Sequence, residues 1–174
     1  LDRASDGRRL MGSAVKPFVW ASAFETGRFK PEDKMLDSPV TYSSGGGRKW
    51  SPHNYGDKYF GEVTLAFALH KSLNSVAIKL LKELDLDAVI ERLSAATGIP
   101  PSGLPRNLTL ALGTADVSPV QMAAAYAAFV NGGRAVKPWW LRRVEDRDGR
   151  TLSESEAPKS EGAVVFSSAT ARLT

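Results

Sequence analysis

The feature that most constrains the fold is an apolar segment that follows a proline, at residues 17–24. Pro17 has no N–H to donate to the carbonyl of Ser13, so residues 13–16 are expected to form a separate opening turn, with the regular helix running from Pro17. Gly27 predicts where this helix ends. A helix without a polar stripe is buried on nearly all sides, so we expect it in the core, where it would hold its opening turn rigidly.

That opening turn contains a hydroxyl nucleophile and an amine base, Ser13 and Lys16. Side chains three residues apart lie on the same face of a helix, so the lysine amine could take the proton of the serine hydroxyl and activate its oxygen. A serine and a lysine at this spacing also arise by chance. The ordinary alternatives are a helix-capping Ser13 and a solvated Lys16 at the surface.

The order and spacing of further motifs decide between these interpretations. Together they resemble the transpeptidase domain of class A penicillin-binding proteins, a group marked by S-x-x-K, an S-x-N type motif and K-T-G. The matching stretches are Arg9–Trp20, Trp50–Tyr55, Val63–Ala77 with Ser72-Leu73-Asn74 inside it, and Leu110–Thr114 leading to Val117–Pro119.

The resemblance implies an α+β fold, rich in helix, with residues 1–174 a partial transpeptidase domain of the penicillin-binding protein and serine β-lactamase fold holding only part of its antiparallel sheet. It implies a peptidoglycan D,D-transpeptidase in which Ser13 is the nucleophile, Lys16 its base, Ser72 a proton relay and Asn74 the ligand of the substrate amide. Stem peptides and β-lactam antibiotics are the implied partners. It also implies an extracytoplasmic protein, membrane-anchored in the parent, with a glycosyltransferase domain upstream.

The third motif of the family is missing from the sequence. No Lys-Ser-Gly or Lys-Thr-Gly occurs, and the nearest string is Lys159-Ser160-Glu161. By resemblance, that motif lies on a strand after the helix that residues 167–174 begin, so we expect a chain that stops before it. Without that strand's oxyanion donor and second lysine, we expect the 174-residue chain to be inactive and Lys16 to stay protonated.

Two alternatives stay open from the sequence. A β-lactamase or β-lactam sensor of the same fold would differ in whether its acyl-enzyme turns over with water. A non-catalytic interaction module would keep the scaffold without its chemistry, although the presence of Ser13, Lys16, Ser72 and Asn74 argues against it.

Composition excludes several other classes. Cysteine is absent and the two histidines, His53 and His70, form no cluster, so we expect no metal site and no cofactor. Net charge is +4, but acidic residues interrupt the basic ones throughout, which argues against nucleic-acid binding. The longest apolar run, residues 122–130, is far shorter than the roughly 20 residues of a membrane span. The sequence does not determine the oligomeric state.

Local signals predict the remaining elements. Residues 29–59 are rich in Pro, Gly and Ser and are expected to be a long loop, with Trp50, Asn54 and Tyr55 as its anchors and His53 as an ordinary loop residue. Ser72–Asn74 is expected to join two helices. The predicted helices are 64–70, 75–84, 87–97 and 118–131, and the predicted hairpin joins 139–144 to 151–152 through Asp148-Gly149.

Overall fold

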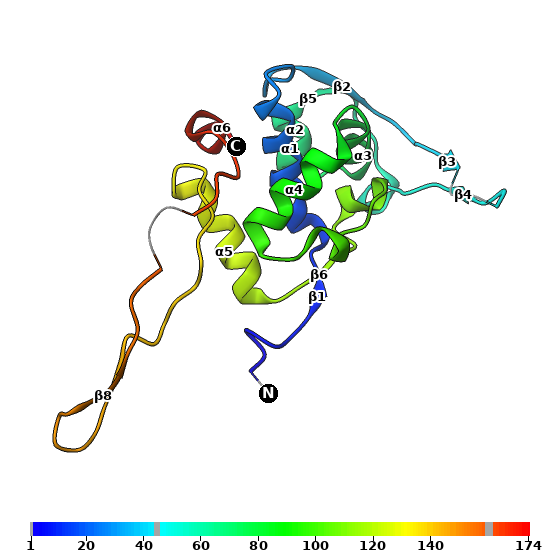
Figure 1. Ribbon diagram of the computed structural model, residues 1–174. Helices are drawn as coiled ribbons and strands as arrows, with labels where there is room; N and C mark the ends of the chain where they lie inside the picture. Colours follow the sequence, from blue (N-terminus) through cyan, green and yellow to red (C-terminus); the bar gives the residue numbers. More distant parts are fainter. Residues whose placement is uncertain (1, 44–45, 159–161) are drawn as a thin grey trace.

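Helices form the body of the molecule, and short pairs of strands lie at its margins (Figure 1). The computed structural model describes residues 2–43, 46–158 and 162–174. The α-helices are α1 Lys16–Glu25, α2 Leu65–His70, α3 Asn74–Lys82, α4 Leu86–Thr97, α5 Pro119–Val130 and α6 Ser168–Leu173. The 3₁₀ helices are η1 Gly12–Val15, η2 Tyr55–Asp57, η3 Pro101–Gly103 and η4 Leu108–Leu112.

All the strand pairs of the described residues are antiparallel and short. Each makes a separate two-stranded sheet, so the predicted α+β class, rich in helix with little sheet, is confirmed. The pairs are β1 Arg9–Leu10 with β6 Asp116–Val117, β2 Lys34–Asp37 with β5 Gly61–Thr64, β3 Tyr42–Ser43 with β4 Lys49–Trp50, and β7 Arg143–Glu145 with β8 Thr151–Glu154.

Helix α1 is the centre of the core, as its apolar sequence predicts. Eight of its residues are buried, and α3, α4 and α6 pack around it (Figure 1). Phe18 is fully buried and contacts the ring of Phe129 on α5, which stacks on Phe166 at a centroid distance of 5.6 Å. Burying an aromatic side chain of this size contributes roughly 1.5–3 kcal/mol. The largely apolar, buried α1 therefore fixes the position of the turn that precedes it.

The predicted helix boundaries agree with the observed caps. Ser118 accepts a hydrogen bond from the N–H of Gln121, whose side chain accepts from the N–H of Ser118 in return, which is a complete capping box. Thr64 caps α2 in a similar way, and Gly98 ends α4 in the left-handed conformation. These short-range signals place α2, α4 and α5 within a few residues of their predicted ranges.

The prediction of a long loop at residues 29–59 is wrong in part. β2 lies in this segment and pairs with β5, and β3 pairs with β4. The sequence of β2 is Lys-Met-Leu-Asp, and its one buried residue is Asp37. No alternation of apolar and polar residues therefore marks the strand in the sequence. Residues 44–45 of the segment lie outside the described residues.

The β7–β8 hairpin is present, with Gly149 in its turn at a φ of 78°. It extends away from the helical body in Figure 1. The string at residues 159–161, nearest to the missing third motif, lies outside the described residues.

Candidate active site

The opening turn of α1 has its own geometry. Residues Gly12–Val15 form the 3₁₀ helix η1, and the N–H of Lys16 donates to the carbonyl of Ser13. Side chains three residues apart eclipse each other in a 3₁₀ helix, so Ser13 and Lys16 project from the same side. From α5, Tyr126 Oη donates to the carbonyl of Ala14 at 2.9 Å. The separate turn predicted from Pro17 is confirmed, and it is held on both sides.

Residues 113–115 hold the start of this turn through backbone hydrogen bonds. The N–H of Met11 donates to Ala115 O and the N–H of Gly12 donates to Gly113 O, both at 3.0 Å. Gly113 has a φ of +68°, and a Cβ at this position would lie 2.2 Å from Gly12 O. Only glycine allows the two backbones to approach this closely. Residues 114–116, which the sequence left without a role, thus lead from this contact into the strand β6.

The amine of Lys16 joins the two sequence motifs. Its Nζ donates to the Ser72 carbonyl at 2.6 Å, to Ser72 Oγ at 3.0 Å and to Asn74 Oδ1 at 2.7 Å. The expected hydrogen bond between Lys16 and the Ser13 hydroxyl is not among the contacts of the described residues. The long lysine side chain instead reaches a group of three acceptors. Lys16, Ser72 and Asn74 therefore meet directly, and Ser13 stands one turn before Lys16.

Burial changes the acid–base behaviour of this lysine. The side chain of Lys16 is 1% exposed. Desolvation disfavours the charged form and lowers the pKa of Lys16 from 10.5 to about 8. With that pKa, about a tenth of the amine is neutral at pH 7, compared with less than one part in a thousand for an ordinary lysine. Burial alone therefore raises the neutral fraction of the Lys16 amine near pH 7 by more than a hundredfold.

Ser72 has an unusual backbone conformation. Its φ is +53°, in the left-handed region that costs a residue with a side chain about 1–2 kcal/mol. It lies between α2 and α3, as predicted, and this conformation places both its carbonyl and its hydroxyl on Lys16. Strain of this kind is concentrated at functional sites.

Asn74 is held at both ends of its side-chain amide. Its Oδ1 accepts from Lys16, and its Nδ2 donates to the carbonyl of His53 at 2.7 Å. The imidazole of His53 instead pairs with Asp57 at the surface, which agrees with its prediction as an ordinary loop residue. Both ends of the Asn74 amide are therefore already hydrogen-bonded within the protein.

The anchoring of residues 50–55 differs from the prediction. Tyr55 is fully exposed, so its assignment as an anchor is wrong. Asn54 is the buried residue of this stretch, and its Oδ1 accepts from the N–H of Asn74 at 2.8 Å. Sequence reasoning missed this contact with the second motif, since nothing in the spacing of two residues 20 apart predicts it.

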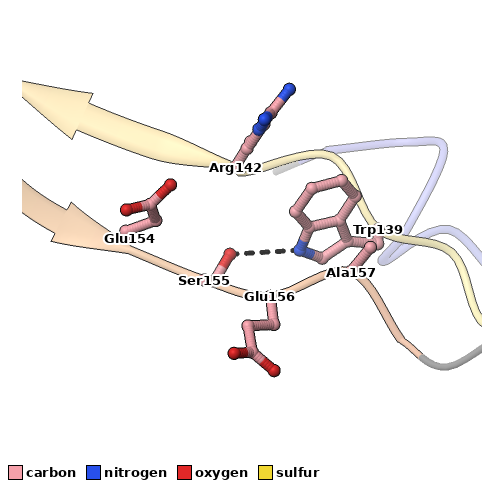
Figure 2. Close-up of a pocket in the computed structure, with 6 residues that line it drawn as sticks. All are labelled: Trp139, Arg142, Glu154, Ser155, Glu156 and Ala157. Atoms are coloured by element: carbon pink, nitrogen blue, oxygen red, sulfur yellow. Dashed lines mark hydrogen bonds between the residues drawn. The ribbon is translucent and has the colours of Figure 1, made fainter.

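Further properties of the described chain concern metal ligands, membrane spans and one further hollow. Within residues 2–43, 46–158 and 162–174, no group of three or more His, Asp or Glu side chains is placed to hold a metal ion. No helix in the same ranges has the length and apolar character needed to cross a membrane. A hollow of about 700 Å³ lies at the base of the β7–β8 hairpin, where Trp139 Nε1 donates to Ser155 Oγ (Figure 2). Its lining contains no lysine beside a hydroxyl; it consists of Trp139, Arg142, Glu154, Ser155, Glu156 and Ala157.

Comparison with known proteins identifies the family of the chain. The family model described as penicillin binding protein transpeptidase domain matches residues 1–174. Penicillin-binding protein 1A of Pseudomonas aeruginosa is 36% identical over 159 residues, covering 91% of this chain and 19% of the relative. Penicillin-binding protein 1A of Aquifex aeolicus is 35% identical, covering 88% of this chain and 21% of the relative. The chain thus spans about a fifth of the length of these curated relatives.

A solved structure gives the same answer for the fold. The crystal structure of penicillin-binding protein 1A from Haemophilus influenzae superposes with a TM-score of 0.87 at 28% identity. The superposition covers 99% of this chain and 30% of that chain.

Proposed function

The chain belongs to the penicillin-binding protein transpeptidase family, and we propose that residues 1–174 are the part of a peptidoglycan D,D-transpeptidase domain that carries the acylating serine. One observation supports this most strongly. A buried lysine amine with a pKa of about 8 stands one turn after Ser13 and hydrogen-bonds both polar residues of the second motif. An ordinary structural lysine keeps its charged head in water.

In the proposed acylation step, Ser13 Oγ attacks the carbonyl of the penultimate D-alanine of a stem peptide. The serine proton passes to the neutral amine of Lys16 as the ester bond forms. The bond to the terminal D-alanine breaks, and its nitrogen takes up a proton through Ser72. The backbone N–H of Ser13 would donate to the oxyanion of the tetrahedral intermediate.

The hydrogen bonds of Lys16 support the role of Ser72 as a relay. A protonated amine has three N–H donors, which match the three acceptors from Ser72 and Asn74. A neutral amine has two, and its lone pair can then accept the Ser72 hydroxyl proton. Loss of the proton from Lys16 therefore reverses one hydrogen bond and leaves the other two in place.

In the second half of the reaction, the amine of a neighbouring stem peptide attacks the Ser13 ester. A new amide bond forms as the bond to Ser13 Oγ breaks; the attacking nitrogen gives up one proton through Ser72 to Lys16, and Lys16 returns a proton to the Ser13 oxygen. The site then holds the same groups as at the start. β-Lactams would acylate Ser13 by the same attack on their ring carbonyl. Because peptidoglycan lies outside the cytoplasmic membrane, we place this activity on that side.

The experiment that tests this function is penicillin labelling of a chimaera. Residues 1–174 replace the matching segment of the Pseudomonas aeruginosa penicillin-binding protein 1A, which supplies a complete domain. The chimaera is incubated with a fluorescent penicillin, and the acylated peptide is identified by mass spectrometry. We expect a stoichiometric adduct on Ser13, abolished by Ser13→Ala and slowed by Lys16→Met.

Four outcomes distinguish the candidate functions. An adduct that persists for hours supports a transpeptidase, whereas rapid hydrolytic release would identify a β-lactamase. Labelling that is unchanged by Ser13→Ala would refute the assignment of the nucleophile. A folded chimaera that never labels would favour a non-catalytic module.

A further inference from the structure

A buried polar cluster lies directly behind the second motif, and it consists of Asp37, Asn54 and Ser75. We propose that Asp37 is a positioning residue: through Asn54, it fixes the start of α3 and thereby holds Asn74 against Lys16. This inference rests on the proposed function, because it assigns Asp37 and Asn54 to the same acylation site.

The burial of this cluster requires an explanation. Asp37 is 1% exposed, Asn54 is 6% exposed and Ser75 is 0% exposed. Burying a carboxylate or an amide is costly unless it is fully hydrogen-bonded. These side chains can be buried because they are hydrogen-bonded to one another.

In the described chain, the Asp37 carboxyl faces hydrogen-bond donors from three residues. Oδ1 accepts from Asn54 Nδ2 at 2.7 Å and from Ser75 Oγ, and Oδ2 accepts from the N–H of Phe60 at 2.9 Å. A carboxylate is an acceptor only and matches this set of donors. Lys79 adds a nearby positive charge, because its Nζ donates to the carbonyl of Leu36, next to Asp37.

Asn54 connects Asp37 to the second motif, Ser72–Asn74. Its Nδ2 donates to Asp37 and to the carbonyl of Lys58, so its Oδ1 must face the other way. Oδ1 accepts from the N–H groups of Asn74 at 2.8 Å and of Ser75 at 3.1 Å. The first N–H groups of a helix have no partner within it, and Leu73 at the N-cap of α3 supplies no side-chain acceptor. Asn54 is therefore the cap of α3, supplied from a distant part of the chain.

The last link joins the cap to the reacting groups. Asn74 has its backbone N–H on Asn54 and its Oδ1 2.7 Å from Lys16 Nζ. If the cap is lost, the first turn of α3 can shift, and Asn74 shifts with it, together with Ser72 two residues earlier. A misplacement of about 1 Å at a reacting centre costs about 10²-fold in rate. Asp37 touches no reacting atom and acts only through Asn54 and Ser75.

The first test is hydrogen exchange of the 174-residue chain, which requires no catalytic activity. Asp37→Asn keeps the volume but puts an amide where three donors converge. We expect exchange at the amides of Asn74 and Ser75 to accelerate at least 10-fold relative to the amide of Ile90 in α4. Phe166→Leu is the control, because it loosens the stacking of Phe166 on Phe129, outside both α3 and α4, and should leave this ratio unchanged.

The second test measures the acylation rate in the chimaera. Asp37→Asn and Asn54→Asp each break the hydrogen bond between residues 37 and 54. Asn54→Asp does so by placing a second carboxylate against that of Asp37. We expect each to slow penicillin acylation by about 10²-fold at a temperature well below its Tm. In the double variant Asp37→Asn/Asn54→Asp, the amide at position 37 can donate to the carboxylate at position 54. Its acylation rate should therefore exceed that of either single variant. Leu93→Ala should lower the Tm and leave the acylation rate unchanged.

The outcomes separate this inference from the proposed function. If Ser13 is labelled and Asp37→Asn acylates at the wild-type rate with normal protection of Asn74 and Ser75, Asp37 is not a positioning residue. If both single variants are slow and the double variant is no faster, the cluster only stabilises the fold. If labelling does not depend on Ser13, the proposed function fails, and hydrogen exchange still decides whether Asp37 orders the start of α3.

Discussion

The amine of Lys16 lies 3.0 Å from the hydroxyl of Ser72, although 56 residues separate them in the chain. This contact brings together the motif at residues 13–16, at the start of α1, and the motif at residues 72–74, where α2 is joined to α3. It also explains why the lysine is buried at the start of an apolar helix, because its charged end meets acceptors from Ser72 and Asn74 rather than water.

Stability should depend on pH through Lys16. Its pKa falls from 10.5 to about 8 on folding. Between these values the unfolded chain binds the proton and the folded chain does not, so stability increases as the pH rises from 8 to 10.5. The gain is roughly 3 kcal/mol at 1.36 kcal/mol per pKa unit. Urea unfolding of wild type and Lys16→Met measures it as the pH dependence of their difference, and a constant difference would contradict the prediction.

The left-handed conformation of Ser72 predicts an unusual order of stability. Glycine adopts a φ of +53° without steric cost, whereas alanine keeps the strain. We therefore expect Ser72→Gly to be more stable than Ser72→Ala by about 1 kcal/mol, measured by thermal unfolding. Ser94, inside α4, is the control, because there alanine should exceed glycine by about 1 kcal/mol. The same order at both positions would show that Ser72 is not strained.

Gly113→Ala should disrupt the turn that carries Ser13. The new Cβ would lie 2.2 Å from Gly12 O, so the two backbones must separate. Gly27→Ala is the matched control, since Gly27 has a φ of +69° but no atom near its Cβ position. We expect Gly113→Ala to lose about 2 kcal/mol more than Gly27→Ala in denaturant unfolding. Equal losses would mean that φ strain alone matters at Gly113.

The docking of α6 should depend on Glu25. Its carboxylate accepts from the N–H and the hydroxyl of Ser167, the N-cap of α6. Burial alone would raise the pKa of Glu25, but hydrogen bonds from Thr170 and Ser167 hold it below its usual value of 4.5. This stabilisation is present above pH 4.5 and is lost as the pH falls through the lowered pKa.

Glu25→Gln should therefore accelerate hydrogen exchange at Ala171 near neutral pH and remove the acid dependence of that exchange. The amide of Ile90 serves as the reference in the same spectra. Unchanged protection of Ala171 in Glu25→Gln would show that apolar packing alone holds α6.

The sequence by itself determined the parts of this protein that depend on neighbouring residues. Pro17 set the start of the regular helix, Ser118 and Gln121 set the start of α5, and Gly98 set the end of α4. Each signal acts within one helical turn, so no tertiary contact is needed to interpret it. The order and spacing of the motifs also sufficed to identify the family.

Tertiary structure alone decided which groups the site residues touch. Asn54 caps a helix 20 residues away, Asp37 orients Asn54, and Gly113 supports the turn of Ser13. The four-residue strand β2 gains its partner through chain topology and has no alternating pattern of its own. These contacts depend on the path of the whole chain, and a lysine side chain as long as that of Lys16 can reach acceptors on several neighbouring elements. Because α3 packs against α1, the acceptors that Lys16 reaches are those of Ser72 and Asn74.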